Sequence, residues 1–370
     1  MINKFSEKEE LDIFLKKNYS KKIFLLCGEK SFKNSGANFF FKKFLRSKNL
    51  QIFFKKKYLP ELQELKLIIK KIDQFEPNLI IAIGGGSVID YAKISNIVKL
   101  KPDLEKLISN YSYPYDKKKA KLIVIPTTAG SGAEVTSNAV IYINKIKYSL
   151  ESELLIPDKY FLIPEFIIKS SKKIKSSAGF DAIAQSMESL ISKKSNNLSV
   201  QYATQSLKIS SQYFLRSLQN PSLNNVGKMC IAANLSGKAI NISKTTAPHA
   251  LSYPFSAYFN MSHGHAVSLF FERFLKYNFD NYNNSTTSFD LLKRYEILFK
   301  IFKVKNINQL NYKISSIKKK SNLIDDLNKL NIDTNKYSKK IIKGVNILRL
   351  SNNPVSLNED VLKKIICLKK

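Results

Sequence analysis

LIIAIGGGSVIDYAK, residues 79–93, is the stretch of this sequence that decides its fold. Its apolar first third predicts a buried strand, its three glycines a tight turn, and the residues from Ser87 onward a helix. The glycines let the backbone approach a ligand closely, and the helix start presents free N–H groups and a positive dipole end. A phosphate or pyrophosphate is the expected ligand. Because the stretch matches neither GxGxxG nor the P-loop, a glycine turn needed only for packing is the alternative.

Short apolar segments alternate with helical patterns on both sides of this stretch. Strands are expected at Ile23–Cys27, Ile52–Phe54, Leu79–Ile83 and Leu122–Ile125, and helices at Asn38–Leu45, Leu62–Gln74 and Ser87–Val98. Strands separated by helices of this length form βαβ units and a parallel sheet. We therefore expect residues 1–164 to form an α/β domain.

Beyond about Pro164 the strand-like alternation disappears. Helices are expected at Ala178–Ile191, Ser199–Ser217 and Gly227–Ile240. Leu323, Leu327 and Leu330 have helical spacing, which predicts that the basic tail, residues 303–370, is also helical. Residues 165–370 are therefore predicted to form an all-helical domain.

A second glycine-rich loop, IPTTAGSGAEVT at residues 125–136, follows the strand expected at residues 122–125. It carries four hydroxyl groups, on Thr127, Thr128, Ser131 and Thr136. Ligands of open α/β sheets bind at the carboxyl edge of the sheet, where this loop and the first one both begin. Together the two loops would surround the phosphates and ribose of a nucleotide.

A third pattern lies in the helical half. Asp181 and Gln185 are four residues apart and share a helical face, and the three histidines of the chain are His249, His263 and His265. A carboxylate with imidazoles is the ligand set expected for a divalent metal such as Fe²⁺ or Zn²⁺. The alternative is that these histidines are structural.

The chain of 370 residues has a formal net charge of +32, from 61 Lys and Arg against 29 Asp and Glu. Such a charge is typical of nucleic-acid-binding proteins, but only five of the basic residues are arginines. Base readout relies on the bidentate arginine fork, so a lysine-rich background composition explains most of the charge better than a nucleic-acid partner. A basic nucleic-acid-binding protein remains the distant alternative.

The cysteines, Cys27, Cys230 and Cys367, form no CxxC pair, which argues against a disulfide framework or a thiolate zinc site. The N-terminus lacks the apolar region of a signal peptide, and no apolar run approaches the ~20 residues of a membrane span. We therefore expect a cytoplasmic protein with no membrane partner.

These motifs, in this order, resemble those of the iron-containing alcohol dehydrogenases, relatives of glycerol dehydrogenase and dehydroquinate synthase. Gly84–Lys93 resembles the family pattern GGGSxxDxxK, and Pro126–Thr136 resembles PTTAGTGSEVT. The resemblance implies a dehydroquinate synthase-like fold, in which a Rossmann-like α/β domain for a nicotinamide cofactor precedes an all-α domain. It also implies a homo-oligomer, most simply a dimer.

The resemblance assigns roles to individual residues. Gly85, Gly86 and Ser87 would hold the cofactor pyrophosphate, Thr127, Thr128, Ser131 and Thr136 would line its ribose path, and Lys147 would lie near the nicotinamide ribose. At Gly28, where relatives that prefer NAD often carry an acid, the absence of a carboxylate and the nearby Lys30 and Ser31 favour NADPH. The adjacent Glu29 could instead favour NADH.

The expected metal site departs from the family pattern of one Asp and three His. Asp181, His249 and His263 match three of these ligands, while Gln185 replaces the histidine of DAxxH. An amide oxygen is a poorer ligand than imidazole, so weak or absent Fe²⁺ or Zn²⁺ retention is expected. Tyr253 also replaces a family histidine. Without a strong metal, His249, His265 or Tyr253 would supply the catalytic hydrogen bonds, or a three-ligand metal site would have to suffice. The proton would come from His265 or a cofactor ribose hydroxyl, with Lys147 beside the cofactor.

Two further segments, KYSLE at residues 147–151 and ISKTTAPHALSYP at residues 242–254, resemble the phosphonoacetaldehyde reductases of this family. That branch implies reduction of phosphonoacetaldehyde, a small anionic aldehyde, to 2-hydroxyethylphosphonate. Ser243, Lys244 and Thr245 would bind the phosphonate. The alternative is that these residues form a helix cap or turn, and the alternative function is a general alcohol dehydrogenase acting on small aldehydes.

Overall fold

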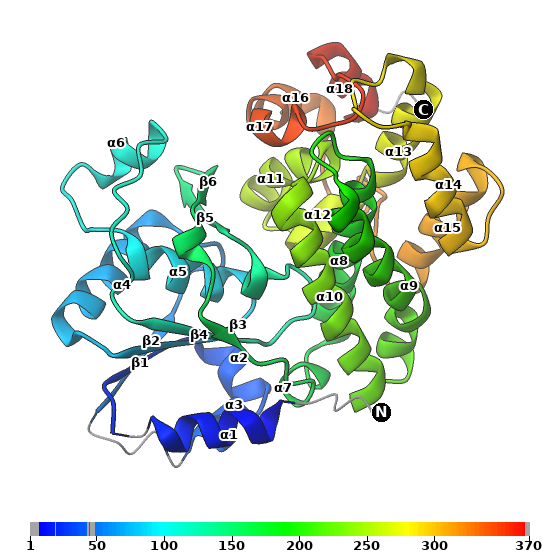
Figure 1. Ribbon diagram of the computed structural model, residues 1–370. Coiled ribbons are helices and arrows are strands. Elements are labelled where there is room, and N and C mark those ends of the chain that lie inside the picture. Colours follow the sequence, from blue (N-terminus) through cyan, green and yellow to red (C-terminus); the bar gives the residue numbers. More distant parts are fainter. Residues whose placement is uncertain (1–6, 19, 43, 45–48, 367–370) are drawn as a thin grey trace. The chain divides into compact units, whose positions relative to one another are not determined.

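The computed structural model describes residues 7–18, 20–42, 44 and 49–366 (Figure 1). Cys367 and the end of the helix predicted at 38–45 lie outside the described residues. The chain forms two compact units, one of Met1–Ser171 with Pro221–Asn234 and the other of Lys172–Asn220 with Leu235–Lys370. The sequence places the domain boundary at residue 164.

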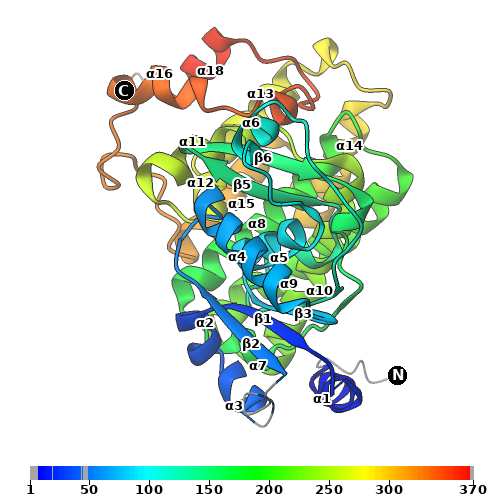
Figure 2. The same ribbon diagram turned by 90° about the vertical axis from the view of Figure 1, so that its left-hand side faces the viewer.

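The first unit is built on a parallel five-stranded sheet of order β2-β1-β3-β4-β7. Its elements are α1 (Lys8–Lys17), β1 (Ile23–Gly28), α2 (Glu29–Asn34), α3 (Ala37–Phe41), β2 (Leu50–Lys55), α4 (Leu62–Phe75), β3 (Leu79–Gly84), α5 (Gly86–Ile97), α6 (Leu104–Ser109), β4 (Lys121–Pro126), η2 (Ala133–Val135), β5 (Asn138–Ile143), β6 (Ile146–Glu151), η3 (Glu153–Leu155), β7 (Lys159–Tyr160) and α7 (Glu165–Ile168). Figure 2 shows β2 and β1 side by side, with α4 and α5 above them.

The strands of this sheet are apolar on both faces because helices cover both. Alternate residues of β3 point to opposite sides, so Ile80 and Ala82 join a core with α4 and α5, while Ile81 and Ile83 join a core with α1, α2 and α3. This arrangement explains why β3 reads as a continuous apolar run. The predicted parallel α/β architecture is confirmed.

A two-stranded antiparallel hairpin, β5 with β6, was not expected from the sequence. Its turn is Asn144 and Lys145, which both have positive φ, 50° and 66°. Two-residue turns of this kind match the twist of the flanking strands, but they are usually marked by Asn-Gly or Asp-Gly. Because Lys145 stands where glycine is usual, the sequence does not show the typical marker of a hairpin turn.

The second unit is helical. Its elements are α8 (Lys172–Ile191), α9 (Asn197–Gln219), the later part of α10 (Leu223–Ser243), α11 (Ala247–Phe259), α12 (His263–Ser268), α13 (Phe271–Asp280), η4 (Tyr282–Asn284), α14 (Leu291–Phe302), α15 (Ile307–Lys320), α16 (Thr334–Lys343), α17 (Ile347–Leu350) and α18 (Glu359–Ile366). None of the helices in the described ranges is long and apolar enough to cross a membrane.

The tail carries the predicted helices, α15 to α18, but the leucines whose spacing suggested them belong to none of these helices. Leu323, Leu327 and Leu330 lie in the irregular segment between α15 and α16, the last two of them in a turn. The carboxylate of Asp326 accepts the N–H groups of Asn328 and Lys329, at 3.0 and 3.4 Å, which offers the backbone a turn in place of helical bonds. The leucines still pack inward, so their spacing reflects burial and not helical structure.

Candidate functional site

The two glycine loops meet in the first unit. Gly84 pairs in register with Pro126 at the carboxyl ends of β3 and β4. A Cβ on Gly85 would lie 3.3 Å from Oγ1 of Thr128, and one on Gly86 would lie 3.1 Å from Oγ of Ser131. The structure therefore brings four of the predicted cofactor residues together, beside the first turn of α5, where Ser87 lies.

A buried lysine holds the second loop in shape. The ammonium group of Lys93, on α5, donates to the carbonyls of Ala133, Thr136 and Asn138 at 2.9, 2.6 and 2.7 Å, and to the Thr136 hydroxyl at 3.0 Å. Burial lowers the pKa of Lys93 to about 8, against the opposing effect of Asp90 and Glu134. The Thr136 hydroxyl thus supports the loop from inside. Thr127 is also buried, and its N–H donates to the Gly84 carbonyl at 3.0 Å.

Lys147 lies on β6, and its positive charge affects the pKa of Asp90 on α5. Burial raises the pKa of Asp90 to about 6, and the charges of Lys93 and Lys147 partly offset this rise. The half-buried Lys147 is therefore close to the helix that begins at the first glycine loop. Its role beside a nicotinamide ribose stays a prediction.

The residues that bear on cofactor choice follow β1. The Ser31 hydroxyl donates to the Gly28 carbonyl at 3.0 Å, and Glu29 forms an exposed ion pair of 2.8 Å with Lys33. The carboxylate that could favour NADH is therefore already paired, while Lys30 is exposed. The preference for NADPH stays a prediction.

In the second unit, three helices bring Asp181, His249 and His263 together. One ligand atom from each lies within 4.8 Å of the others. Asp181 Oδ1 lies 3.1 Å from His249 Nε2 and 3.9 Å from His263 Nε2. Asp181 is on α8, His249 on α11 and His263 at the start of α12, so residues far apart in the sequence form one cluster, which we call the triad.

A buried glutamate orients His249. Glu188 Oε1 lies 2.5 Å from His249 Nδ1, and its Oε2 accepts the N–H and the hydroxyl of Thr246, at 2.7 and 2.9 Å. Burial disfavours the charged ring, but the carboxylates of Glu188 and Asp181 outweigh it and raise the pKa of His249 to about 9. Glu188 fixes the ring so that Nε2 faces Asp181. The sequence analysis missed it, although it lies on α8 seven residues after Asp181, about two helical turns along the same face.

Gln185 positions Asp181. Its side-chain N–H donates to Asp181 Oδ2 at 3.2 Å, and its carbonyl oxygen accepts from the Ser236 hydroxyl at 3.0 Å. The oxygen that could bind a metal is thus engaged by Ser236. The donor set that remains, one carboxylate and two imidazoles with supporting partners, fits a divalent metal with three protein ligands.

A glycine allows α12 to reach α8. A Cβ on Gly264 would lie 1.9 Å from the Ser177 carbonyl oxygen and 2.9 Å from the Asp181 Cβ. The N–H of His265 donates to the Ser177 hydroxyl at 3.1 Å in the same contact. No larger residue would let His263 approach Asp181 with the helices at this separation.

His265 does not join the triad. Its Nε2 bonds the Ile324 carbonyl at 2.6 Å, so the ring points to the turns that follow α15. Tyr253 is closer, because its ring stacks on that of His263 with centroids 5.9 Å apart. Burial raises the pKa of Tyr253, while hydrogen bonds to Arg349 and Thr245 act in the opposite direction.

The predicted phosphonate residues have different surroundings. Ser243 is fully buried at the last position of α10, and its hydroxyl donates to Ser189 Oγ at 2.8 Å, so a structural role at the helix end fits it better than ligand binding. Lys244 is half-buried and has φ of +61°, in the left-handed region that non-glycine residues rarely adopt. Thr245 is buried beside Tyr253.

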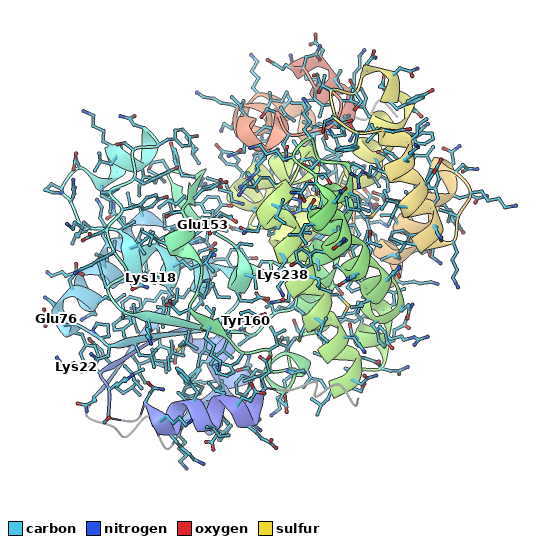
Figure 3. The ribbon with its side chains drawn as sticks, in the orientation of Figure 1. Lys22, Glu76, Lys118, Glu153, Tyr160 and Lys238 are labelled. Carbon is cyan, nitrogen blue, oxygen red and sulfur yellow. The ribbon has the colours of Figure 1, made fainter. Side chains whose placement is uncertain are left out.

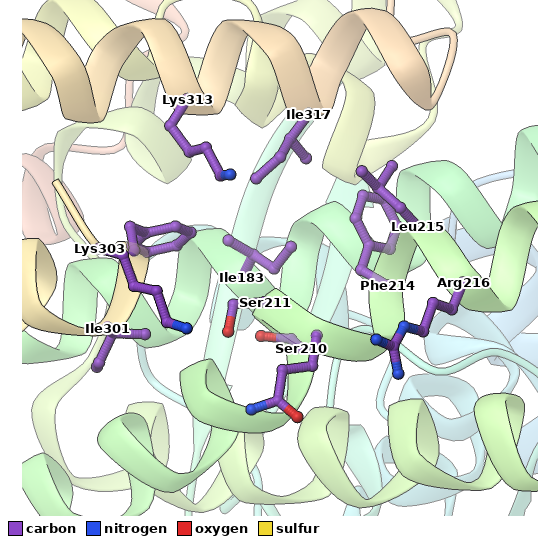
Figure 4. Close-up of a pocket in the computed structure, with 12 residues that line it drawn as sticks. Ile183, Ser210, Ser211, Phe214, Leu215, Arg216, Ile301, Lys303, Lys313 and Ile317 are labelled. Atoms are coloured by element: carbon purple, nitrogen blue, oxygen red, sulfur yellow. The ribbon is translucent and has the colours of Figure 1, made fainter.

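A separate pocket of about 410 Å³ lies in the second unit and contains no triad residue (Figure 4). Side chains from α9 and α15 line it, together with Lys303 and the end of α14. Ile183 also lines it, from the helix that carries Asp181. The pocket therefore lies against α8 without including the triad.

Two family models match the chain. The model of iron-containing alcohol dehydrogenases matches residues 7–164, and the C-terminal model of the same family matches residues 175–368. The chain belongs to the iron-containing alcohol dehydrogenase family. The predicted family, the enzyme class and the fold of a parallel α/β domain followed by a helical domain are thereby confirmed.

Individual relatives agree with this membership. The 4-hydroxybutyrate dehydrogenase of Clostridium kluyveri is 29% identical over 285 residues, which are 74% of this chain and 73% of that protein. The bifunctional aldehyde-alcohol dehydrogenase of Escherichia coli is 28% identical over 260 residues, 66% of this chain but only 29% of that larger protein. The sulfoacetaldehyde reductase from Bifidobacterium kashiwanohense, solved with NAD⁺, shares the fold with a TM-score of 0.84 at 23% identity, over 97% of this chain and 94% of that one.

Proposed function

We propose that this iron-containing alcohol dehydrogenase reduces phosphonoacetaldehyde to 2-hydroxyethylphosphonate with a nicotinamide cofactor. The observation that carries the reaction class is the triad, whose ligand atoms lie within 4.8 Å of one another. Support for an anionic substrate comes from two similar proteins named for anions, a 4-hydroxybutyrate dehydrogenase and a sulfoacetaldehyde reductase. The cofactor of the second of these, NAD⁺, supports the nicotinamide.

The residues of the triad prepare a site for a carbonyl oxygen that gains negative charge during reduction. A divalent metal bound there would polarise the carbonyl, and a nicotinamide at the glycine loops would supply the hydride. Asp181, His249 and His263 would hold the metal, with Glu188 orienting one imidazole and Gln185 the carboxylate. These supporting contacts keep the donor atoms in place before a ligand arrives.

Tyr253 would contribute a hydroxyl next to this site. Because burial raises its pKa, the phenol keeps its proton at neutral pH and can donate a hydrogen bond. Its ring stacks on His263, one of the triad residues. Lys244 would add a positive charge near Thr245, and its left-handed backbone, which costs of order 1 kcal/mol or more, is a strain of the kind found at functional positions.

The test is a comparison of aldehydes with and without an anionic group. Purified protein, supplied with Fe²⁺ or Zn²⁺, is assayed with NADPH and NADH on phosphonoacetaldehyde, sulfoacetaldehyde, acetaldehyde and butyraldehyde, following the reduced nicotinamide by absorbance. We expect kcat/KM for phosphonoacetaldehyde to exceed that for acetaldehyde at least tenfold, the gain of one charge-assisted contact. Equal turnover of uncharged aldehydes would instead support a general alcohol dehydrogenase.

A further inference from the structure

We infer that Arg349, on α17, recognises the anionic group of the substrate and so determines the preference for anionic aldehydes. This inference rests on the proposed function. It assigns a task to the basic tail, which the sequence motifs left without one.

Arg349 differs from the other arginines that the structure describes. It is the buried one, 9% exposed, whereas Arg216, Arg273 and Arg294 are half-buried or exposed. A charged side chain is placed in such surroundings only at a cost in solvation, unless a partner or ligand compensates it. The burial therefore calls for a specific role.

The surroundings of the guanidinium place it next to the triad. α17 packs against α11, which carries Tyr253, and the N–H of Asn346 donates to the Ala250 carbonyl at 3.4 Å. The charge of Arg349 acts on the Tyr253 hydroxyl, and the ring of Tyr253 stacks on His263. Glu188, the carboxylate that acts on Tyr253, already has both oxygens engaged by His249 and Thr246. In a short aldehyde, one carbon separates the carbonyl from the anionic group, so neighbouring protein groups must bind the two ends.

The fold holds this part of the tail firmly. Asn346 Oδ1 accepts the N–H of Arg349 at 2.9 Å and caps α17. The side chain of Asn352 donates to the Ser192 hydroxyl at 2.7 Å and to the carbonyls of Ser243 and Thr245 at 2.8 and 3.0 Å. These bonds tie α17 to the loop that precedes His249, so the position of Arg349 is fixed relative to that loop.

The chemistry of the guanidinium fits a phosphonate or sulfonate. Its planar fork can donate two parallel hydrogen bonds to two oxygens of such a group, which an ammonium group cannot match in geometry. The neutral hydroxyl of Tyr253, on which Arg349 acts, adds a donor without adding repulsion. Arg349 would act on binding and only indirectly on the chemical step.

The experiment compares Arg349→Gln and Arg349→Lys with a matched control, Arg216→Gln, whose side chain is exposed on α9. For each protein, kcat and KM are measured on phosphonoacetaldehyde and on acetaldehyde. We expect Arg349→Gln to lower the ratio of kcat/KM for the anionic to the neutral aldehyde about ten- to hundredfold, mainly through KM. Arg349→Lys should lie between it and the wild type, and Arg216→Gln should leave the ratio unchanged.

A binding measurement gives an independent readout. Titration calorimetry with methylphosphonate should show a Kd for Arg349→Gln at least tenfold above that of the wild type and of Arg216→Gln. Equal losses on both aldehydes with an unchanged methylphosphonate Kd would make Arg349 structural and overturn the inference. If the wild type itself shows no preference for anionic aldehydes, the proposed substrate fails, and that failure is visible before any variant is made. Should Arg349→Gln fail to fold, Arg349→Lys is the test variant, and an unchanged ratio of kcat/KM for the anionic to the neutral aldehyde would overturn the inference.

Discussion

Gln185 is the residue at which this chain departs most clearly from the pattern of its family. Its amide bridges Asp181 and Ser236, so it orients the carboxylate of the triad with a hydrogen bond. A histidine there could direct a nitrogen to the metal, whereas the amide oxygen is engaged by Ser236. The chain therefore keeps the three strong metal donors of the triad, and Gln185 holds one of them, Asp181, in place.

We expect Gln185→His to tighten Fe²⁺ or Zn²⁺ binding by at least tenfold, because an imidazole replaces an amide in the donor set. Metal content after dialysis against a chelator, measured by mass spectrometry, checks this. Gln212→His, which adds an exposed histidine on α9, is the matched control and should not change retention. A stoichiometric metal that resists the chelator in the unmodified protein would show that three ligands already suffice.

At the scale of elements, the triad depends on the approach of α12 to α8. Gly264 leaves room for that approach, since any Cβ would overlap the Ser177 carbonyl at 1.9 Å. Both helices carry a triad residue near the contact, Asp181 on α8 and His263 at the start of α12. A small separation of the helices would therefore lengthen the distance between two ligands.

Gly264→Ala should lower the free energy of unfolding by about 1–3 kcal/mol or more, as expected for overpacking against backbone, and should weaken the binding of added Fe²⁺ or Zn²⁺ relative to the unmodified protein. Thermal unfolding and metal analysis measure the two effects. The control is Ser262→Ala at the N-cap of the same helix, whose hydroxyl has no hydrogen-bond partner within the described residues. An alanine variant that retains metal and stability like Ser262→Ala would show that the helices can separate without cost.

At the scale of the whole molecule, the net charge of +32 is spread over both units. Figure 3 shows side chains with nitrogen tips around the surface of each unit, with Lys22 and Lys118 labelled in the first and Lys238 in the second. Scattered lysines do not form a site, but their summed field attracts anions. The expected absence of a nucleic-acid partner and the expected dimer both stay predictions.

The positive electrostatic field of the protein predicts that salt raises KM for a charged substrate but not for a neutral one. Raising the ionic strength from about 0.02 M to about 0.3 M shortens the Debye length severalfold, so KM for phosphonoacetaldehyde should rise a few-fold. KM for acetaldehyde, measured in the same buffers, should stay constant because the molecule is neutral. Equal salt dependence for the two aldehydes would contradict electrostatic capture.

Some features of this protein were predictable from the sequence because they are local or periodic. The glycine turn at Gly84–Gly86, the alternation of strands and helices, and the histidines at 249 and 263 can all be recognised without knowing what they touch. Hairpin β5–β6 was missed because Lys145 replaces the usual turn glycine, and the leucines at 323–330 misled because burial can produce helical spacing without a helix.

The sequence by itself determined the family and the order of an α/β domain followed by a helical domain, and it supplied Asp181, His249 and His263 as candidate ligands. Only the tertiary structure assigned Glu188 to His249, Lys93 to the second glycine loop, and Arg349 to Tyr253. It also placed Ser243, buried, at the end of α10 and directed the His265 ring away from the triad. The physical reason is that these assignments are hydrogen bonds and packing contacts between segments up to about a hundred residues apart, and no local pattern in the sequence records which side chains folding will bury together.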